Sequence, residues 1–439
     1  MNRDPAALAA QSFDVVVVGG GICGAAIAWD AAQRGLSVAL LERGDFCGAT
    51  SANSLKIVHG GIRYLQHLDI VRVRQSSRER KALLRIAPHV VQPLPVVVPT
   101  EGHGMRGKEA LAAAFALLNT LTLDRNNGLP DPARRIPRAR LISRAEALER
   151  CPGFPGPLDG AGVFWDGQVN HPPRLVWAFV RSAARAGAVV ANYCDVRGLL
   201  RRENRVYGVE VEDRLSGQRF EVRGSVVVNA AGPFADQLYV NAGLRKARTL
   251  PLSRDMAVVI RRPLLRDSAL AVQTIHRDPD AWLSRGPRHL FVVPWRGVTL
   301  IGVHSIIYDG NPYELAPTGA EVETFLREID EAAPWWEVRA SDVAAVYAGL
   351  LPIESDGLRD ANVSFGKRAH VIDNAETDRL EGLITVVANR LTTARGVAER
   401  TVNMVFGKRG AQGPRCRTAE TPLYGGDVTN IAEPNAEGR

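Results

Sequence analysis

Residues 13–42 read FDVVVVGGGICGAAIAWDAAQRGLSVALLE and decide the fold. The apolar, β-branched run over residues 13–18 is typical of a strand buried on both faces of a parallel sheet. The alanine-rich run over residues 22–34 has helical spacing and closes at Gly35, and a second strand follows over residues 37–42. Together these elements form a β-α-β unit, which predicts an α/β fold with a Rossmann-like parallel sheet.

Three glycines follow the first strand and open the helix in the spacing G-x-G-x-x-G. In this context Gly19 allows a tight turn, Gly21 lets the backbone approach a pyrophosphate, and Gly24 lets the helix pack against the strand. The N-terminus of the helix favours anionic phosphates. Glu42 ends the second strand, at roughly the 20-residue distance where a carboxylate accepts hydrogen bonds from a ribose hydroxyl. The unit is therefore predicted to bind a dinucleotide, either FAD or NAD.

A second turn of small residues, Ala230-Ala231-Gly232, follows a buried strand within SVVVNAAGPFAD, residues 225–236. In an NAD protein with one dinucleotide domain, this late strand has no evident use. The second turn therefore favours FAD as the cofactor.

The composition is that of an ordinary globular protein, with 46% hydrophobic and 23% charged residues among 439. At roughly 150 residues per domain, a chain of this length is expected to hold more than one domain. The net charge of +8 is not gathered into any zinc-finger, basic-zipper or ribonucleoprotein pattern, so nucleic-acid binding is not expected. The five cysteines form no close pair, which indicates neither a disulfide framework nor a metal site and fits a reducing cytoplasm.

Short β-rich runs between residues 250 and 308 predict an antiparallel sheet separate from the parallel one. Helices are predicted at residues 70–86, 172–186, 319–333 and 394–406. We therefore expect a discontinuous FAD-binding domain and a second, antiparallel substrate domain. The FAD-binding domain would comprise residues 12–95, 160–250 and 350–412, the substrate domain residues 96–159 and 251–349, and the C-terminal tail residues 413–439.

The longest apolar run, residues 110–123, is shorter than the roughly 20 residues that a membrane-spanning helix needs. It is expected to be a helix of the core or, as the less favoured alternative, a helix at a membrane surface. Residues 1–12 contain no secretory signal, so a cytoplasmic location is expected, with peripheral contact on the inner face of the membrane left open. The oligomeric state is not predicted.

The sequence resembles the FAD-dependent glycerol-3-phosphate dehydrogenases, which belong to a wider superfamily with D-amino-acid oxidase and glycine oxidase. The resemblance spans almost the whole chain. Four stretches carry it: VVVVGGGICGAAIAWDAAQRGLSVALLER from residue 15, GATSANSLKIVHGGIRYLQ from residue 48, VVNAAGPFAD from residue 227 and VVANRLTTARGVAE from residue 386. It implies oxidation of a small hydroxylated, anionic metabolite such as glycerol 3-phosphate, with electrons passed to a quinone or to oxygen.

The resemblance also implies site residues. The FAD would be bound by the two glycine turns and by further residues beside the pyrophosphate, flavin and adenine: Gly19, Gly21, Gly24, Glu42, Thr50, Ser51, Lys56, Val196, Ala231, Gly232, Leu391, Thr392 and Thr393. His59 would accept the hydroxyl proton, while Arg63, Tyr64 and Arg390 would orient the substrate. Alternatively, His59 only hydrogen-bonds the loop or the flavin, and the arginines form structural ion pairs.

Several positions depart from the family where the substrate is expected to bind. The family's Tyr-x-Gly-x-Arg-Pro segment reads YAGLLP over residues 347–352, so Leu351 replaces the phosphate-binding arginine. Arg390 replaces a lysine, and Met256 aligns with an expected histidine. The stretch after Gly407 has no counterpart of the helical C-terminal domain that many of these dehydrogenases carry.

Losing a bidentate phosphate partner is not a neutral change. Arg254, Lys367 or Arg368 could replace it, or the substrate could be a related hydroxylated or carboxylated metabolite. Two further alternatives are an amine or amino-acid oxidase of the same superfamily, and a flavoprotein whose substrate site has decayed.

Overall fold

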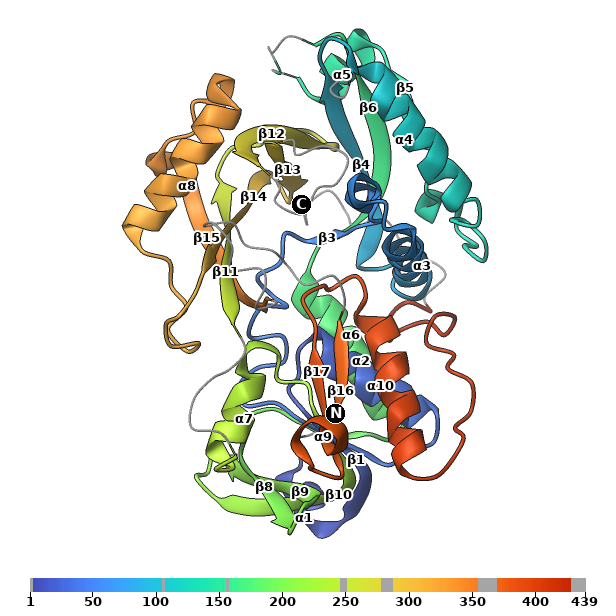
Figure 1. Cartoon of the computed structure of the whole chain (residues 1–439), viewed down its shortest axis with the longest axis vertical. Coiled ribbons are helices and arrows are strands. Elements are labelled where there is room, and N and C mark those ends of the chain that lie inside the picture. The colour runs from blue at the N-terminus through green and yellow to red at the C-terminus, as the bar shows by residue number, and fades with distance from the viewer. Residues whose placement is uncertain are drawn as a thin grey trace.

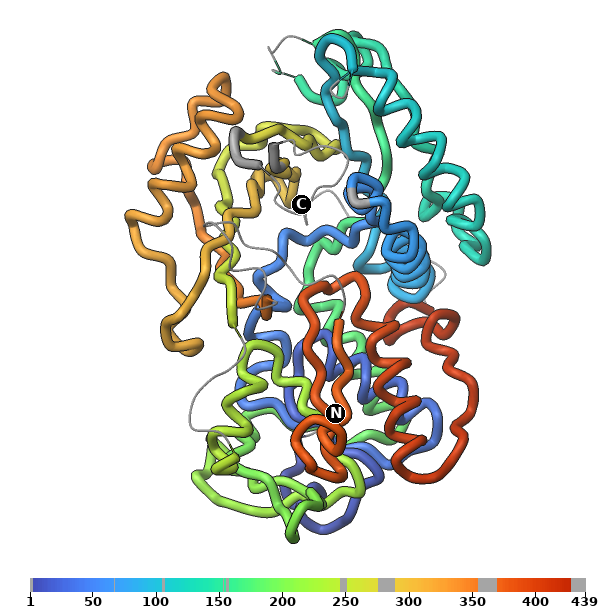
Figure 2. The backbone as a smooth tube through the Cα atoms, in the orientation of Figure 1, coloured from blue at the N-terminus to red at the C-terminus, as the bar shows by residue number. Residues whose placement is uncertain are grey.

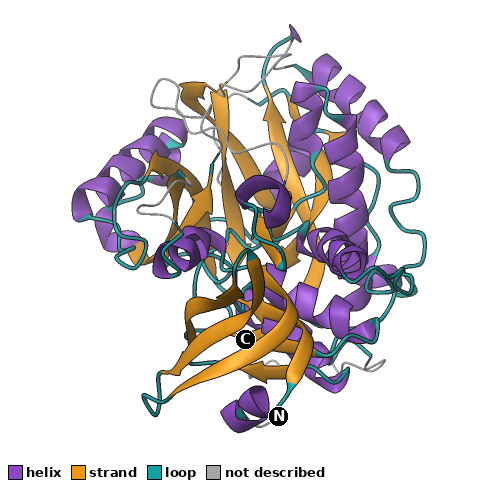
Figure 3. Ribbon diagram, turned by 60° about the horizontal axis from the view of Figure 1, so that its bottom comes forward, coloured by secondary structure: helices purple, strands orange, loops and turns teal. Residues whose placement is uncertain are grey.

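Two sheets, one of eight strands and one of nine, organise the residues that the structure describes (Figure 1). The structure is a computed structural model and describes residues 3–104, 107–152, 154, 158–244, 251–277, 287–353 and 369–427. Helices lie on the outside of both sheets (Figure 3).

The first sheet has the strand order β16-β17-β10-β1-β2-β7, in which β17, β10, β1, β2 and β7 run parallel and β16 runs antiparallel to β17. The bounds of these strands are β1 (Ser12–Val18), β2 (Val38–Leu41), β7 (Val189–Ala191), β10 (Arg219–Asn229), β16 (His370–Asp373) and β17 (Leu383–Val387). β8 (Cys194–Arg202) and β9 (Arg205–Asp213) join β10 in an antiparallel meander. Val15, Val16 and Val17 of β1 are fully buried, which explains the uninterrupted apolar run in the sequence.

Helices cover both faces of the first sheet. On one face α2 (Ile22–Gln33) packs with α6 (Pro172–Arg185) and α10 (Ala394–Lys408), and Trp29 meets Phe179 edge-on. On the other lie the meander, α1 (Pro5–Ala10) and α7 (Ala235–Asn241), which begins after η4 (Gly232–Phe234). α9 (Asn374–Asp378) follows β16. Figure 2 shows that segments coloured blue, green and red, far apart in sequence, interleave in this half of the molecule.

The second sheet has the order β15-β11-β14-β13-β12-β4-β6-β3, with β5 paired to β6. Its strands are β3 (Ile57–Val58), β4 (Val91–Thr100), β5 (Arg140–Ile142), β6 (Gly160–Val169), β11 (Leu252–Ile260), β12 (Ala269–Arg277), β13 (Pro287–Trp295), β14 (Val298–Ile307) and β15 (Val343–Pro352). Its helices are η1 (Ile62–His67), α3 (Ile70–Ile86), α4 (Lys108–Leu121), η3 (Pro132–Arg134), α5 (Arg144–Arg150), α8 (Gly319–Ala332), η5 (Pro334–Trp336) and η6 (Ala340–Asp342). Apart from the parallel pair β4 and β12, the described pairs are antiparallel, as the sequence predicted.

The sheet assignment differs from the predicted domain boundaries at four strands. The second sheet includes β3, β6 and all of β4 and β15, whereas the sequence placed residues 57–58, 160–169, 91–95 and 350–352 with the first. The sequence pattern of a buried apolar strand is the same in either sheet, because the partner strand is decided by contacts with residues far away in the sequence. The described part of the tail, residues 413–427, is a loop, as expected, but it packs against α3, because Leu423 is fully buried and donates its N–H to the Ile86 carbonyl.

The expectation of a core helix at residues 110–123 is wrong, because α4 lies on the surface. Phe115 is its one buried residue, while Leu117 is exposed and Leu123, just past its end, is 69% exposed. The run is apolar, but the helix covers the sheet with one narrow face only, so most of its surface meets solvent. Among the described residues, no helix is both long and apolar enough to cross a membrane.

Candidate active site

A cavity of about 710 Å³ opens where the parallel strands of the first sheet end. Its wall includes the residues that follow β1, β2, β10 and β17, together with parts of β11, β14 and β15 from the second sheet. Strand order reverses at β1, since β2 lies on one side of it and β10 on the other. Ligands of open α/β sheets bind in the crevice at such a switch point. The cavity is therefore the candidate site.

The glycine turn after β1 has the geometry that the sequence predicted. Gly19 has φ +104°, and a Cβ there would lie 2.7 Å from the Ala230 carbonyl oxygen. A Cβ on Gly24 would lie 1.8 Å from the Gly19 carbonyl oxygen, so Gly24 lets α2 approach the turn without itself lining the cavity. Gly21 is the N-cap of α2 and lines the cavity. It has no side chain to accept the first N–H groups of the helix, which are placed to meet an anion.

Glu42 ends β2 and lines the cavity. Its carboxylate accepts N–H groups from Gly20 at 2.7 Å and from Gly44 at 2.8 Å. Burial raises the pKa of Glu42, and these two N–H groups act in the opposite direction. Each carboxylate oxygen keeps a further lone pair, so the group can still accept a ribose hydroxyl.

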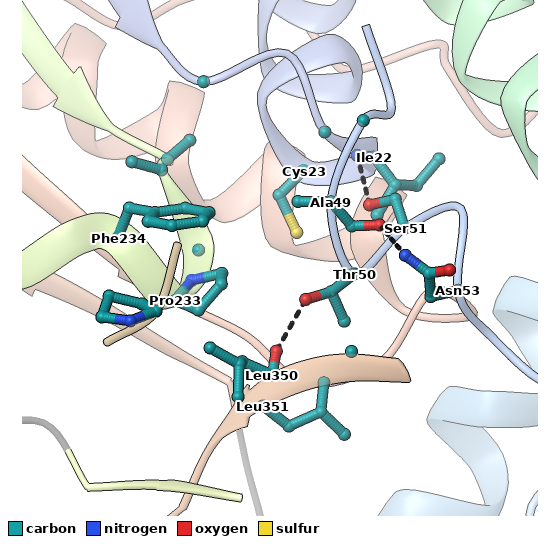
Figure 4. Close-up of a pocket in the computed structure, with 18 of the residues that line it drawn as sticks. Ile22, Cys23, Ala49, Thr50, Ser51, Asn53, Pro233, Phe234, Leu350 and Leu351 are labelled. Carbon is teal, nitrogen blue, oxygen red and sulfur yellow. Dashed lines mark hydrogen bonds between the residues drawn. The ribbon is translucent and has the colours of Figure 1, made fainter. Parts of the chain in front are cut away.

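The loop over residues 48–55 crosses the middle of the cavity (Figure 4). Ser51 Oγ accepts the Ile22 N–H at 3.1 Å, which ties the loop to the start of α2. Thr50 Oγ1 donates to the Leu350 carbonyl oxygen at 2.7 Å, which ties the loop to β15. Because the two bonds run to different sheets, this loop joins the cofactor side of the cavity to the substrate side.

The turn that carries His59 is held by two backbone hydrogen bonds. The His59 N–H donates to Thr392 Oγ1 at 3.2 Å, and the Gly60 N–H donates to Asp166 Oδ1 at 2.5 Å. Asp166, on β6, also pairs with Arg80 of α3 at 3.0 Å, and both side chains are buried. The second sheet therefore fixes the position of a histidine that faces the cavity.

Burial, and to a smaller extent the charges of Arg390, Arg80 and Arg63, lower the pKa of His59 to about 3. The imidazole is therefore neutral at pH 7, and one ring nitrogen has a lone pair that can accept a proton. A neutral histidine surrounded by guanidinium groups suits an anionic ligand, because the anion would offset the positive charges.

Of the three residues predicted to orient the substrate, one lines the cavity and two lie outside its wall. Arg390 lines the cavity, and its guanidinium lies 5.0 Å from the centre of the Tyr64 ring. Tyr64 meets the His59 ring edge-on, with ring centres 5.8 Å apart, but is outside the cavity wall. Arg63 is exposed and also outside the wall, so its influence on His59 is electrostatic at most.

The substrate side of the cavity is mostly apolar. Met256, Val303 and Leu351 line it, with Asp255 as a carboxylate in the same wall. Arg254 does not replace the missing arginine, because it is buried against Glu321 and lies 4.9 Å from the Tyr308 ring. Lys367 and Arg368 lie outside the described residues.

Most of the predicted cofactor-binding residues come together in the wall. These are Gly19, Gly21, Glu42, Thr50, Ser51, Val196, Ala231, Gly232, Leu391 and Thr392. Thr393, the N-cap of α10, is buried behind the wall. Lys56, also predicted to bind the cofactor, is not among the residues of the wall. Its side chain is buried, with Nζ 3.9 Å from the centre of the Tyr347 ring and 4.8 Å from that of Trp295.

The wall residues that sequence reasoning did not assign include Arg43, Phe234 and Tyr313. Arg43 and Phe234 directly follow recognised motifs, Glu42 and the Ala231-Gly232 turn, so their positions were available as a signal. Tyr313 lies in a loop without a motif, and no local pattern could have found it.

The residues of the cavity fit FAD. Gly232 has φ +58°, and a Cβ there would meet nothing within 4 Å, so the second turn leaves room for a ligand. The start of α2, where the N-cap Gly21 has no side chain, can meet an anion, and the carboxylate of Glu42 can accept a ribose hydroxyl. Among the described residues, no three His, Cys, Asp or Glu side chains gather as a metal ion would require.

Comparisons with known proteins agree with this geometry. The family model described as FAD dependent oxidoreductase matches residues 14–404. A glycerol-3-phosphate dehydrogenase of Synechocystis is 32% identical over 431 residues, covering 95% of this chain and 74% of the relative. The mitochondrial glycerol-3-phosphate dehydrogenase of Macaca fascicularis is also 32% identical, but the chain spans only 58% of its length.

Among solved structures, the glycerol-3-phosphate dehydrogenase of Bacillus halodurans complexed with FAD is similar, with a TM-score of 0.72 and 27% identity. The match covers 96% of this chain and 70% of that one.

Proposed function

The chain belongs to the family of FAD-dependent oxidoreductases, and we propose that it oxidises a small hydroxylated, anionic metabolite, with glycerol 3-phosphate as the lead compound. When bound, FAD supplies an acceptor for a hydride at flavin N5. The observation that carries the proposal is the neutral His59 among guanidinium groups, at the place where both sheets contribute to one cavity.

His59 accepts the proton of the substrate hydroxyl. Its neutral ring holds a lone pair, and the turn around Gly60 keeps the ring at the cavity wall. In the free protein a pKa of about 3 makes the imidazole a weak base. A bound anion would offset the charges of the nearby arginines, which are the smaller cause of the low pKa after burial, and would therefore make the imidazole a stronger base.

Arg390 binds the anionic group of the substrate. It is the arginine of the His59 cluster that lines the cavity, and its planar guanidinium suits a phosphate or carboxylate. Tyr64 lies beneath its guanidinium and beside His59, so it holds the two groups in a fixed relation. The apolar wall at Leu351 excludes water from the opposite side.

The test is an anaerobic absorbance titration of the FAD-loaded protein. Glycerol 3-phosphate, glycerol, 2-hydroxy acids and amino acids are added in turn while the oxidised flavin band is followed. Bleaching by glycerol 3-phosphate and not by glycerol supports the proposal. Bleaching only by another class of compound reassigns the substrate, and no bleaching by any of them favours a decayed substrate site.

The second candidate is an amine or amino-acid oxidase, favoured by Leu351 at the phosphate-binding position. Arg390 would then bind a carboxylate, and no alcohol base would be needed. Replacing His59 by Asn would leave the rate of flavin reduction by an amino acid nearly unchanged, whereas it would slow oxidation of an alcohol.

We also propose that the reduced flavin passes its electrons to a quinone at a membrane surface. Exposed apolar side chains in two groups, which we take together as one apolar patch, support this proposal: Leu68, Ile70 and Val71 at and just before the start of α3, and Leu117 and Leu123 on and just after α4. Arg74 joins its two parts, because it lies in α3 and pairs with Asp124, after α4, at 2.5 Å. Basic α3 side chains beside an apolar patch suit an anionic lipid surface.

Co-sedimentation with vesicles containing anionic phosphatidylglycerol tests the membrane contact. Val71→Asp and Leu123→Asp should each lower the bound fraction several-fold. Leu215→Asp is the matched control, since Leu215 is equally exposed at 65% but lies between β9 and β10. Equal binding by all variants, or faster oxidation of the reduced flavin by oxygen than by a quinone analogue, would contradict the proposal.

A further inference from the structure

Residues 308–318, between β14 and α8, reach from the second sheet to the first. At their tip, the Tyr313 ring stacks on Phe234, with ring centres 5.0 Å apart and planes inclined by 19°. Arg43 lies over both rings, with its guanidinium carbon 4.3 Å from the Tyr313 centre and 5.6 Å from that of Phe234. Phe234 follows β10 and Arg43 follows β2, so the contact joins three separate parts of the chain.

This contact lies at one end of the cavity already described. Arg43, Phe234 and Tyr313 line the same wall as Glu42 and Val196, where the ribose and adenine of FAD are expected. Figure 4 shows Phe234 across the cavity from Ser51. The stack therefore borders the adenosine end of the cofactor site.

Contacts within the protein hold residues 308–318 in one conformation without a ligand. The Tyr308 hydroxyl lies 2.9 Å from the Asn311 carbonyl oxygen and 2.6 Å from that of Glu314. The Tyr313 N–H donates to Asn311 Oδ1 at 3.1 Å. Leu315 packs against a small apolar cluster with buried Leu252 and Leu350. The base of the segment is thus fixed to the second sheet, and Tyr313 is presented at its tip.

Burial does not hold the tip in place. Tyr313 is 48% exposed, so the aromatic stack and the guanidinium above it are the described contacts of this ring with the first sheet. Stacked rings and a cation over an aromatic face attract each other directly. A contact of this kind can open when the cofactor leaves and close again behind it.

We propose that residues 308–318 form a strap across the adenosine end of the FAD site, and that the stack of Arg43, Tyr313 and Phe234 slows the release of FAD. Retention of the cofactor would then depend on the second sheet, although the dinucleotide motifs all lie in the first. The strap acts on FAD whatever the substrate is, so it is independent of the proposed oxidation.

The test measures the rate of FAD release from the loaded protein, followed by flavin fluorescence after dilution. Tyr313→Ala removes the stack and should speed release about tenfold, and Arg43→Gln should speed it about threefold. Tyr313→Phe keeps the ring and should release FAD at the wild-type rate. Tyr424→Ala is the matched control, because Tyr424 is 38% exposed under the guanidinium of Arg181 at 4.4 Å and does not line the cavity.

A wild-type release rate in Tyr313→Ala would overturn the proposal, as would an equal acceleration in Tyr424→Ala. Thermal unfolding without FAD should be the same in Tyr313→Ala and wild type, which separates loss of the strap from loss of the fold. If Tyr313→Ala is purified without FAD, its Kd is measured by titrating FAD into the protein. A Kd raised about tenfold supports the strap, and a wild-type Kd contradicts it.

Discussion

The two sides of the cavity are built on different principles. On the cofactor side, Gly19, Gly21 and Gly232 shape the wall with backbone, and each belongs to a turn directly after a parallel strand. On the substrate side, Met256, Val303 and Leu351 shape it with side chains from β11, β14 and β15. A backbone wall leaves little choice of residue, whereas a side-chain wall can change its chemistry one residue at a time. This contrast accounts for glycine motifs that match the expected pattern beside a substrate side where Leu351 departs from it.

The broadest effect should come from breaking the backbone wall, because this change should weaken both FAD binding and the fold. In Gly24→Ala the new Cβ would lie 1.8 Å from the Gly19 carbonyl oxygen, so the turn must move. We expect FAD affinity to fall on the order of a hundredfold and the free energy of unfolding by about 1–3 kcal/mol. Titration of FAD into the apoprotein measures the first and urea denaturation the second. Gly407→Ala is the control, because a Cβ there meets nothing within 4 Å. Wild-type FAD affinity in Gly24→Ala would show that the turn tolerates movement.

The next prediction concerns His59, which lies between the two walls, and the rate of flavin reduction. His59→Asn removes the proton acceptor but keeps a side chain of similar size. If glycerol 3-phosphate is the substrate, the rate of flavin reduction should fall by about 10²–10⁴-fold in stopped-flow measurements. FAD affinity should stay unchanged, since the cofactor side does not depend on this side chain. A loss of FAD together with activity would instead assign His59 to cofactor binding.

A smaller effect should follow from changing the side-chain wall. Leu351→Arg adds a guanidinium at the position where the resemblance to the glycerol-3-phosphate dehydrogenases implies a phosphate-binding arginine. We expect the KM for glycerol 3-phosphate to fall about tenfold, because a charge-assisted pair with an anion adds binding. Leu351→Met, which preserves size and polarity, should behave as wild type. An unchanged KM in Leu351→Arg would mean that the anion does not approach β15.

The smallest effect should appear in the pH dependence of stability. The pKa of His59 is about 3 in the folded chain and near 6.5 when unfolded. Between these values the unfolded chain binds the extra proton, so this histidine makes stability fall as pH drops from 6.5 toward 3. Thermal unfolding of the apoprotein at pH 7, 6 and 5 should therefore show a smaller loss in His59→Asn than in wild type. His103→Asn, at an exposed histidine, should keep the wild-type slope.

The sequence by itself determined the parallel sheet and the two glycine turns that border the cavity. β1, α2 and the glycines between them are contiguous, and each depends on local backbone geometry that residue type dictates. α3 also follows the sequence closely, over Ile70–Ile86 as predicted, because an uninterrupted helical period is a local property.

Only the tertiary structure decided how distant segments meet. It placed β6 in the second sheet, left α4 exposed, turned Lys56 away from the cavity and brought Tyr313 onto Phe234. It also placed Asp166 behind the turn of His59. Each of these outcomes depends on which surfaces pack together after collapse, and residues far apart in sequence carry no local signal of their eventual partner.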